Sequence, residues 1–237
     1  GVPIFAQINH NGGQGSGMFT RLPSWAPSAI ADPMFREVPK AVEHEDIQEI
    51  IQGYAKVARY TQQGNFDGVE LQCSHSSIVR QFLSRNTNHR TDEYGGGLEN
   101  RLRLLREIIA AIRVAVGRDY PMSVRLCGDE LIRDGIVLDE AVAAARILEA
   151  DGLIDCINTS IGTATQTLYM IEASMRIPPN YAMFIPSAIR KAVNLPVIGV
   201  GRVKDVIQAE RILAEGHADL VGVVRAQIAD PEFVRKS

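Results

Sequence analysis

Short apolar runs alternate along this chain with longer segments in which apolar residues recur every three to four positions. Residues 43–63 and 98–116 show this helical spacing most clearly. The pattern predicts helices at 43–63, 98–116, 139–150, 187–193, 205–215 and, shorter, 226–229. The apolar runs predict strands at 2–8, 68–72, 122–126, 154–158, 197–200 and 220–223.

Regular alternation of strands and helices favours a parallel sheet covered by helices. A dinucleotide-binding fold would need a glycine-rich turn leading at once into a helix, and residues 9–17 (NHNGGQGSG) are not followed by one. The alternative is an α/β TIM (β/α)8 barrel, which has eight strands and about 250 residues. The six predicted strands indicate one domain, 1–237, that holds the last six βα units and lacks the first two strands of the barrel.

Composition excludes several kinds of partner. The 25 Lys and Arg residues nearly balance the 28 Asp and Glu residues, so the formal charge of -3 predicts no nucleic-acid or anionic-membrane partner. No apolar run is long enough to span a bilayer, and the first residues lack a signal-peptide pattern. The spacing of Cys73, Cys127 and Cys156 suits neither a disulfide framework nor a metal pair, which predicts buried free thiols in a cytoplasmic, reducing compartment.

The start at Gly1, without Met, suggests a segment of a longer protein or a processed chain.

In a barrel, functional residues gather at the carboxyl ends of the strands. The polar residues at these ends are Gln7, His10, Gln72, His75, Arg125, Asn158, Ser160, Gly201, Arg202 and Arg225. The set has neutral donors and cations, but it has no carboxylate pair, no metal-ligand spacing and no nucleophile elbow. We therefore predict no metal, and we expect the site to bind an anion or an electron-rich cofactor.

The last two strand ends are the usual phosphate position of this architecture. Backbone N–H groups around Gly201 and Val224, with the guanidinium of Arg225, could bind a phosphate there. Arg125 interrupts an apolar strand, and because an unpaired buried cation is costly, it predicts an anionic partner. A phosphate-binding aldolase or isomerase on the same barrel is a weaker alternative, since no lysine stands at a strand end.

Residues 81–101 (QFLSRNTNHRTDEYGGGLENR) combine many charges with three consecutive glycines. We interpret the charges as a network that locks the loop. The segment 82–101 also resembles the old yellow enzyme family, the NADH:flavin oxidoreductases, as do AQINHNG, APSAI, VRLCGDE, VIGVGRV and DLVGVVRAQIADPEF elsewhere in the chain. Within that family the chain is most similar to the branch of trimethylamine dehydrogenase and bacterial 2,4-dienoyl-CoA reductase, a likeness that RAQIADP supports.

The resemblance implies an FMN-binding barrel that uses NADH or NADPH as electron donor. Gln7 matches the residue that binds the pyrimidine edge of the flavin, and Arg125 matches the cation beside that edge. The phosphate-binding loops match Gly201, Arg202, Val224 and Arg225. An iron–sulfur cluster, which follows the barrel in larger members, is possible only in a longer parent protein.

The resemblance places the substrate at residues 71–77 (LQCSHSS). Family members often hold a carbonyl or anionic ligand with two polar residues three apart, and Gln72 and His75 take these places. Many reductases then have a tyrosine that protonates the substrate, where this chain has Ser77, a far weaker acid. His75, or a water that it holds, is the better candidate acid or base, which leaves amine or alcohol oxidation open.

Two functions follow as hypotheses. The first is an FMN-dependent oxidoreductase that transfers hydride from a nicotinamide or small organic donor to an acceptor such as an activated alkene. The second is a non-catalytic, incomplete barrel, whose open sheet edges need the missing strands, a partner chain or a homo-oligomer before it binds flavin.

Overall fold

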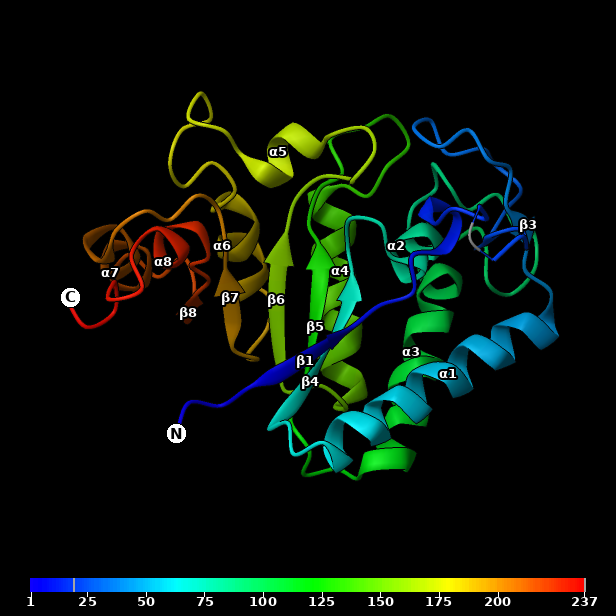
Figure 1. Cartoon of the computed structure of the whole chain (residues 1–237), viewed down its shortest axis with the longest axis horizontal. Coiled ribbons are helices and arrows are strands. Elements are labelled where there is room, and N and C mark those ends of the chain that lie inside the picture. The colour runs from blue at the N-terminus through cyan, green and yellow to red at the C-terminus, as the bar shows by residue number, and fades with distance from the viewer. Residues whose placement is uncertain (19, 237) are drawn as a thin grey trace.

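The computed structural model describes residues 1–18 and 20–236, and its centre is one six-stranded parallel sheet (Figure 1). The strands are β1 (Phe5–Ile8), β4 (Gly68–Cys73), β5 (Met122–Cys127), β6 (Cys156–Ser160), β7 (Val197–Gly199) and β8 (Leu220–Val221). Their order across the sheet is their order along the chain. Sequential parallel strands joined by helices are the arrangement of a (β/α)8 barrel, of which this sheet contains six strands.

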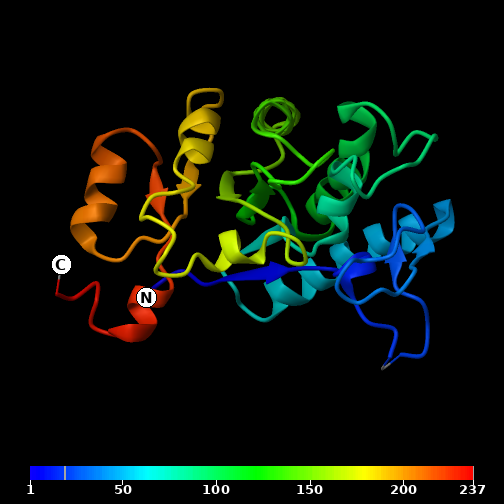
Figure 2. The same cartoon turned by 90° about the horizontal axis from the view of Figure 1, so that it is seen from above.

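Helices cover the outside of the sheet. They are α1 (His44–Gln63), α3 (Leu98–Val116), α4 (Leu138–Asp151), α6 (Phe184–Arg190), α7 (Val206–Ala214) and α8 (Arg225–Ala229). The view from above shows α4, α6 and α7 along one side of the molecule and β1 on the opposite side (Figure 2). The helix ends have local causes: Glu43 and Asp46 form a capping box at the start of α1, and Gly152, with φ of 66°, ends α4 in the left-handed region.

The two faces of β4 differ in polarity. Val69, Leu71 and Cys73 are fully buried and belong to the main hydrophobic core, in which the helices also pack. Successive side chains of a strand point to opposite faces, so Glu70 and Gln72 lie on the other face, in the barrel interior. The barrel interior therefore carries polar side chains at the level of Glu70 and Gln72.

The predicted strands and long helices are confirmed, with shifts at some ends. The strand expected at 154–158 is Cys156–Ser160, and the helix expected at 187–193 is Phe184–Arg190. Further short elements were not predicted: η1 (Gly12–Gln14), β2 (Trp25–Ala26), β3 (Lys40–Ala41), α2 (Ile78–Leu83) and α5 (Leu168–Glu172). All are short pieces within the connections between strands and long helices.

The charged loop 81–101 is held as the sequence suggested. Arg90 pairs with Asp92 at 2.5 Å and also donates to the carbonyl of Val42 at 2.6 Å. Arg101 is 3% exposed and pairs with Glu140 at 2.7 Å. These ion pairs tie neighbouring segments together, which confirms that the loop's charges serve the scaffold.

The cysteines are free thiols, with Cys73 and Cys127 buried and Cys156 half-buried. Burial raises the pKa of Cys73 and Cys127 well above the usual range and that of Cys156 to about 11. Across the described residues, we find no helix that combines the length and apolar character needed to cross a membrane.

Candidate active site

A hydrogen-bonded network joins four strands in the barrel interior, and Glu70 is its centre. Its carboxylate accepts from Gln7 at 2.6 Å, from Ser123 at 3.2 Å and from Asn158 at 2.9 Å. Gln7 in turn accepts from Gln72 at 3.2 Å. The sequence analysis overlooked Glu70, although a carboxylate inside an apolar strand is a signal in itself. The network fixes the amide of Gln7, the residue expected at the cofactor.

Arg125 lies beside this network with part of its guanidinium unsatisfied. It pairs in register with Gln72 on β4 and with Asn158 on β6. Its Nε is buried and has no hydrogen-bond partner among the described residues. Burial lowers the pKa of Arg125, and the charge of Glu70 acts in the opposite direction. A desolvated cation with a free N–H is suited to an anionic or electron-rich partner.

A cavity of about 570 Å³ opens next to Arg125 at the ends of β6, β7 and β8. Its lining includes all four residues expected at a phosphate: Gly201, Arg202, Val224 and Arg225. Gly201 has φ of 157°, and a Cβ there would lie 3.1 Å from Met183 Cε and 3.4 Å from Ala182 N. Glycine is therefore required where the backbone borders the cavity.

Two of the three arginines that line the cavity contact the connection that follows β6. Arg202 donates from Nη1 to the carbonyl of Ile177 at 2.5 Å, and Arg225 donates from Nη1 to the carbonyl of Ala173 at 3.0 Å. A guanidinium has five N–H donors, so each side chain keeps donors for an anion in the cavity.

The residues expected at the substrate follow β4. Gln72 is 8% exposed, and its amide accepts from Ser74 at 2.5 Å and donates to Gln7. His75 has φ of 53° and a buried Nδ1 that has no partner among the described residues. Burial, and then the charge of Arg125, lowers the pKa of His75 to about 4. The imidazole is therefore neutral at neutral pH, and its Nδ1 is enclosed by the protein without a hydrogen-bond partner among the described residues.

Ser77 is placed differently from the expectation. It is fully buried, and its hydroxyl caps α2 by accepting from the backbone N–H of Val79 at 3.1 Å. A hydroxyl that caps a helix and has no exposed surface cannot reach a ligand in the barrel mouth. The structure therefore shows a helix-capping contact for the Ser77 hydroxyl.

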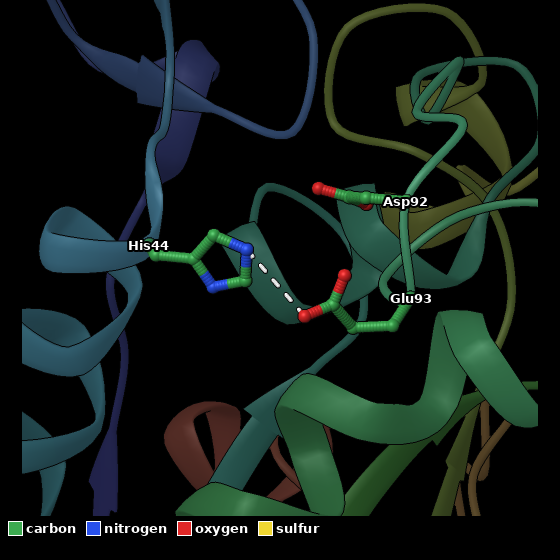
Figure 3. Close-up of side chains that lie close together, drawn as sticks. All are labelled: His44, Asp92 and Glu93. Carbon is green, nitrogen blue, oxygen red and sulfur yellow. Dashed lines mark ion pairs between the residues drawn. The ribbon is translucent and has the colours of Figure 1, made fainter.

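One group of possible metal ligands lies outside the barrel mouth. His44, Asp92 and Glu93 bring their ligand atoms within 4.8 Å of one another (Figure 3). Asp92 is already bound by Arg90, and His44 contacts Glu93 at 3.4 Å. Because these groups satisfy one another at the surface, we assign no cation to them.

Fold and site together define a class: a parallel barrel that binds a phosphate-bearing, electron-rich cofactor at the carboxyl ends of its strands. Residues 1–237 match the NADH:flavin oxidoreductase / NADH oxidase family, and the chain belongs to that family. FMN is the cofactor of this family, and the residues present fit it. Arg125, with its unpartnered Nε, lines the same glycine-bordered cavity, so a cation and backbone N–H groups are available there to an anionic cofactor.

Known proteins extend the comparison. An NADH oxidase of Thermoanaerobacter brockii is 38% identical over 100% of this chain and 36% of its own length. An N,N-dimethylglycine/sarcosine dehydrogenase of Chromohalobacter salexigens is 35% identical over 100% of this chain and 34% of its own. A structure of 2-naphthoyl-CoA reductase with 2-naphthoyl-CoA superposes with a TM-score of 0.91 at 31% identity, covering 98% of this chain and 37% of that protein.

The chain thus spans about a third of the length of these relatives. The family prediction is confirmed. The amine dehydrogenase and the CoA-thioester reductase among the relatives agree with the predicted branch, which contains both kinds of enzyme.

Proposed function

We propose that the protein is an FMN-dependent oxidoreductase that moves hydride between a reduced nicotinamide or small organic donor and a second small molecule. One observation carries the proposal: the desolvated, partly unsatisfied guanidinium of Arg125 beside a cavity of about 570 Å³. Bound FMN supplies hydride chemistry at its N5 position. The protein supplies position and charge.

The interior residues have distinct tasks in this proposal. Arg125 stabilises negative charge on the ring edge, an interaction that is strong in a water-excluded site. Gln7, oriented by Glu70, binds the same edge. The phosphate is bound by the backbone of Gly201 and Val224 and by the backbone and side chains of Arg202 and Arg225.

On the substrate side, the geometry favours oxidation of a donor. His75 is neutral and its pKa is lowered, so at neutral pH it can accept a hydrogen bond but is a weak base and a poor acid. With Ser77 committed to a helix cap, neither residue is a ready proton donor to a substrate carbon. We therefore propose a methylated amine, such as dimethylglycine, as a better substrate class than an activated alkene.

The direct test uses the full-length parent protein loaded with FMN under anaerobic conditions. NADH, NADPH, dimethylglycine and an activated alkene are each compared for their effect on flavin absorbance. We expect a donor to bleach the absorbance and an acceptor to restore it. A parent protein that never retains FMN on purification would refute the proposal.

A second candidate is favoured by the open sheet: that this segment alone binds no flavin. Val2, Ile4 and Phe5 at the β1 edge are 84%, 60% and 44% exposed. A cavity of about 510 Å³ beside β1 is lined in part by Trp25 and Tyr54. FMN affinity measured for residues 1–237, with and without two further strands at the N-terminus, separates the candidates.

A further inference from the structure

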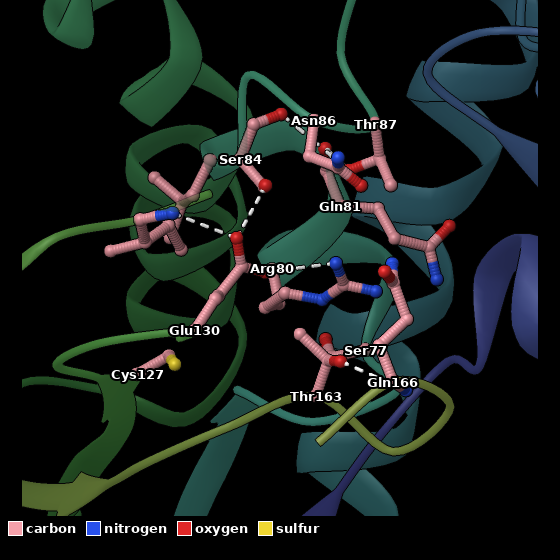
Figure 4. A network of polar contacts seen from close by, with 12 residues as sticks. Ser77, Arg80, Gln81, Ser84, Asn86, Thr87, Cys127, Glu130, Thr163 and Gln166 are labelled. Atoms are coloured by element: carbon pink, nitrogen blue, oxygen red, sulfur yellow. Dashed lines mark hydrogen bonds and ion pairs between the residues drawn. The ribbon is translucent and has the colours of Figure 1, made fainter. Parts of the chain in front are cut away.

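A buried arginine outside the proposed flavin site has donors that the protein does not use. Arg80 on α2 is 1% exposed and donates from Nη1 to Glu130 at 2.9 Å (Figure 4). Glu130 is itself fully buried, and it also accepts from the hydroxyl of Ser84 at 2.5 Å and the backbone N–H of Ile136 at 2.7 Å. The carboxylate of Glu130 therefore has hydrogen bonds to both of its oxygens, and it contacts only Nη1 of Arg80.

The other edge of the guanidinium is free. Nε and Nη2 of Arg80 are both buried without a partner among the described residues. These two atoms form the side edge of an arginine, where two parallel N–H groups match the two oxygens of a carboxylate. A buried N–H group that forms no hydrogen bond costs about 1–3 kcal/mol, and more when the group is charged. The arrangement calls for an acceptor in contact with this edge.

Space for that acceptor exists next to Arg80. A cavity of about 50 Å³ lies between η1, α2 and the connection after β6, and its lining includes Gly13, Gln14, Gln81, Thr87 and Gln166. Figure 4 shows Gln81 and Gln166 on the side of the guanidinium away from Glu130. The volume is enough for one carboxylate group or a few waters. A larger ligand must extend out of the cavity.

The amide of Gln14 adds a second unsatisfied group at the same cavity. Its Oε1 is buried without a partner, and its Nε2 donates to the hydroxyl of Thr165 at 3.0 Å. A hydroxyl can donate as well as accept, so the amide can be placed either way round, with its NH₂ group toward the cavity. In that orientation Gln14 and Arg80 both present donors to one acceptor group.

The charges around the cavity disfavour a dianion more than a monoanion. The Arg80–Glu130 pair is neutral overall, and the carboxylate of Asp32 also lines the cavity. A dianion such as phosphate would meet these two carboxylates. A planar monoanion with two oxygens matches both the free edge and the volume.

We infer that this cavity is a carboxylate-binding site, with Nε and Nη2 of Arg80 as its fork. The carboxylate belongs either to a free small acid or to the substrate, and the second source rests on the proposed function. In either case two parallel N–H groups of Arg80 contact the two oxygens of the ligand, and the ammonium group of a lysine cannot reproduce this pair of contacts.

The first experiment measures acetate binding to the FMN-loaded parent protein by isothermal titration calorimetry at constant ionic strength, with chloride as comparator. We expect saturable binding of acetate that R80K weakens at least tenfold, because lysine keeps the charge next to Glu130 but lacks the fork. R85K is the matched control: Arg85 is a partly exposed neighbour that lies 3.7 Å from Glu140, and its variant should bind acetate normally.

A second variant guards against misfolding of R80K. Q14E places a carboxylate at the cavity without touching the Arg80–Glu130 pair, and we expect it to abolish acetate binding while FMN retention is unchanged. Acetate bound beside the flavin instead would perturb flavin absorbance and persist in both variants. Acetate binding of that kind would overturn the inference. A wild-type protein without saturable acetate binding would also overturn it, and would indicate that the cavity holds water alone.

Kinetics then distinguish the two sources of the carboxylate. If it belongs to the substrate, R80K raises KM for dimethylglycine about tenfold with little change in kcat, and leaves dimethylaminoethanol, the analogue without a carboxylate, unaffected. If acetate binding is lost while both amines behave normally, the site takes a free acid. Because calorimetry needs no turnover, an inactive enzyme would count against the proposed function and not against this site.

Discussion

Glu70 illustrates how much a single side chain contributes to this interior. It gathers three neutral donors from three neighbouring strands, and it influences the pKa of Arg125. The sequence singled out Arg125 and Gln7, because polar groups in or beside apolar strands stand out, and the structure places both residues on strands of the sheet. It missed Glu70 because the run GVEL was interpreted only as a strand, and missed Arg80 because a buried cation in a short helix has no periodic signature.

Replacing Arg125 tests its electrostatic role. R125M should retain the fold but slow flavin reduction about a hundredfold to a thousandfold, since one preorganised charge contact is typically worth roughly 2.7–4 kcal/mol at the transition state. Stopped-flow bleaching under anaerobic conditions measures this rate. R85M serves as the surface control, and a rate for R125M within twofold of wild type would contradict the assignment.

Replacing Glu70 tests the network. E70Q keeps the shape but sets its NH₂ group against other donors, which should lower the free energy of unfolding by about 1–3 kcal/mol and weaken FMN binding. Urea denaturation and FMN titration measure the two effects. E49Q, on the exposed face of α1, should change neither. An E70Q protein as stable as wild type would show that the network is dispensable.

His75 predicts a specific dependence of stability on pH. Its pKa is lowered to about 4 in the folded protein, so above the unfolded value of about 6.5 neither state binds the proton. As pH falls from 6.5 toward 4, the unfolded state takes up the proton and the folded state does not, so stability is lost. Between pH 7 and pH 5 the loss is about 2 kcal/mol, and it should be absent in H75Q.

Urea denaturation of wild type and H75Q at these two pH values makes the comparison. Only the difference between the two proteins matters, since other groups also titrate in this range. Parallel pH dependence in both proteins would show that His75 is solvated in the folded state.

At the scale of elements, periodicity decided what could be predicted. Helix α3 was predicted with its observed bounds, because a long stripe of apolar residues defines it. Helix α2 was missed, since its six residues are all buried and show no polar face. The polar contacts of a short buried helix are set by its neighbours in space, which the sequence alone does not name. The same gap explains why the capping contact of Ser77 was not predicted from the sequence.

The cap makes a separate prediction. S77A should lower stability by about 1 kcal/mol and leave turnover nearly unchanged, whereas S77T should retain much of the cap. Thermal melts and steady-state rates of the FMN-loaded protein measure both. A large loss of kcat in S77A without a loss of stability would restore a catalytic role.

For the whole molecule, the open sheet is the dominant feature. Composition and alternation were enough to predict a barrel with six strands, because sequential parallel strands need a helix between each pair. They were not enough to show how the connections above the sheet fold, since those depend on long-range contacts such as Arg90 with Val42.

The two open edges predict self-association of the segment. Residues 1–237 alone should elute as oligomers in size-exclusion chromatography, because β1 and β8 each expose unpaired backbone groups and nearby apolar side chains. Adding two strands at the N-terminus should shift the protein toward monomer. A stable monomer from the short segment would show that its edges are protected in solution.

The sequential order of the sheet also has a kinetic consequence. Each pairing from β1 to β8 joins strands that are neighbours in the chain's own series, so these contacts have short sequence separations and can form one after another. Closing an eight-stranded barrel would pair the edge of β8 with the first of two further strands that precede β1, a contact across the full chain. We therefore expect closure to be the slow, late step of folding, and the cofactor cavity beside β8 to be completed with it.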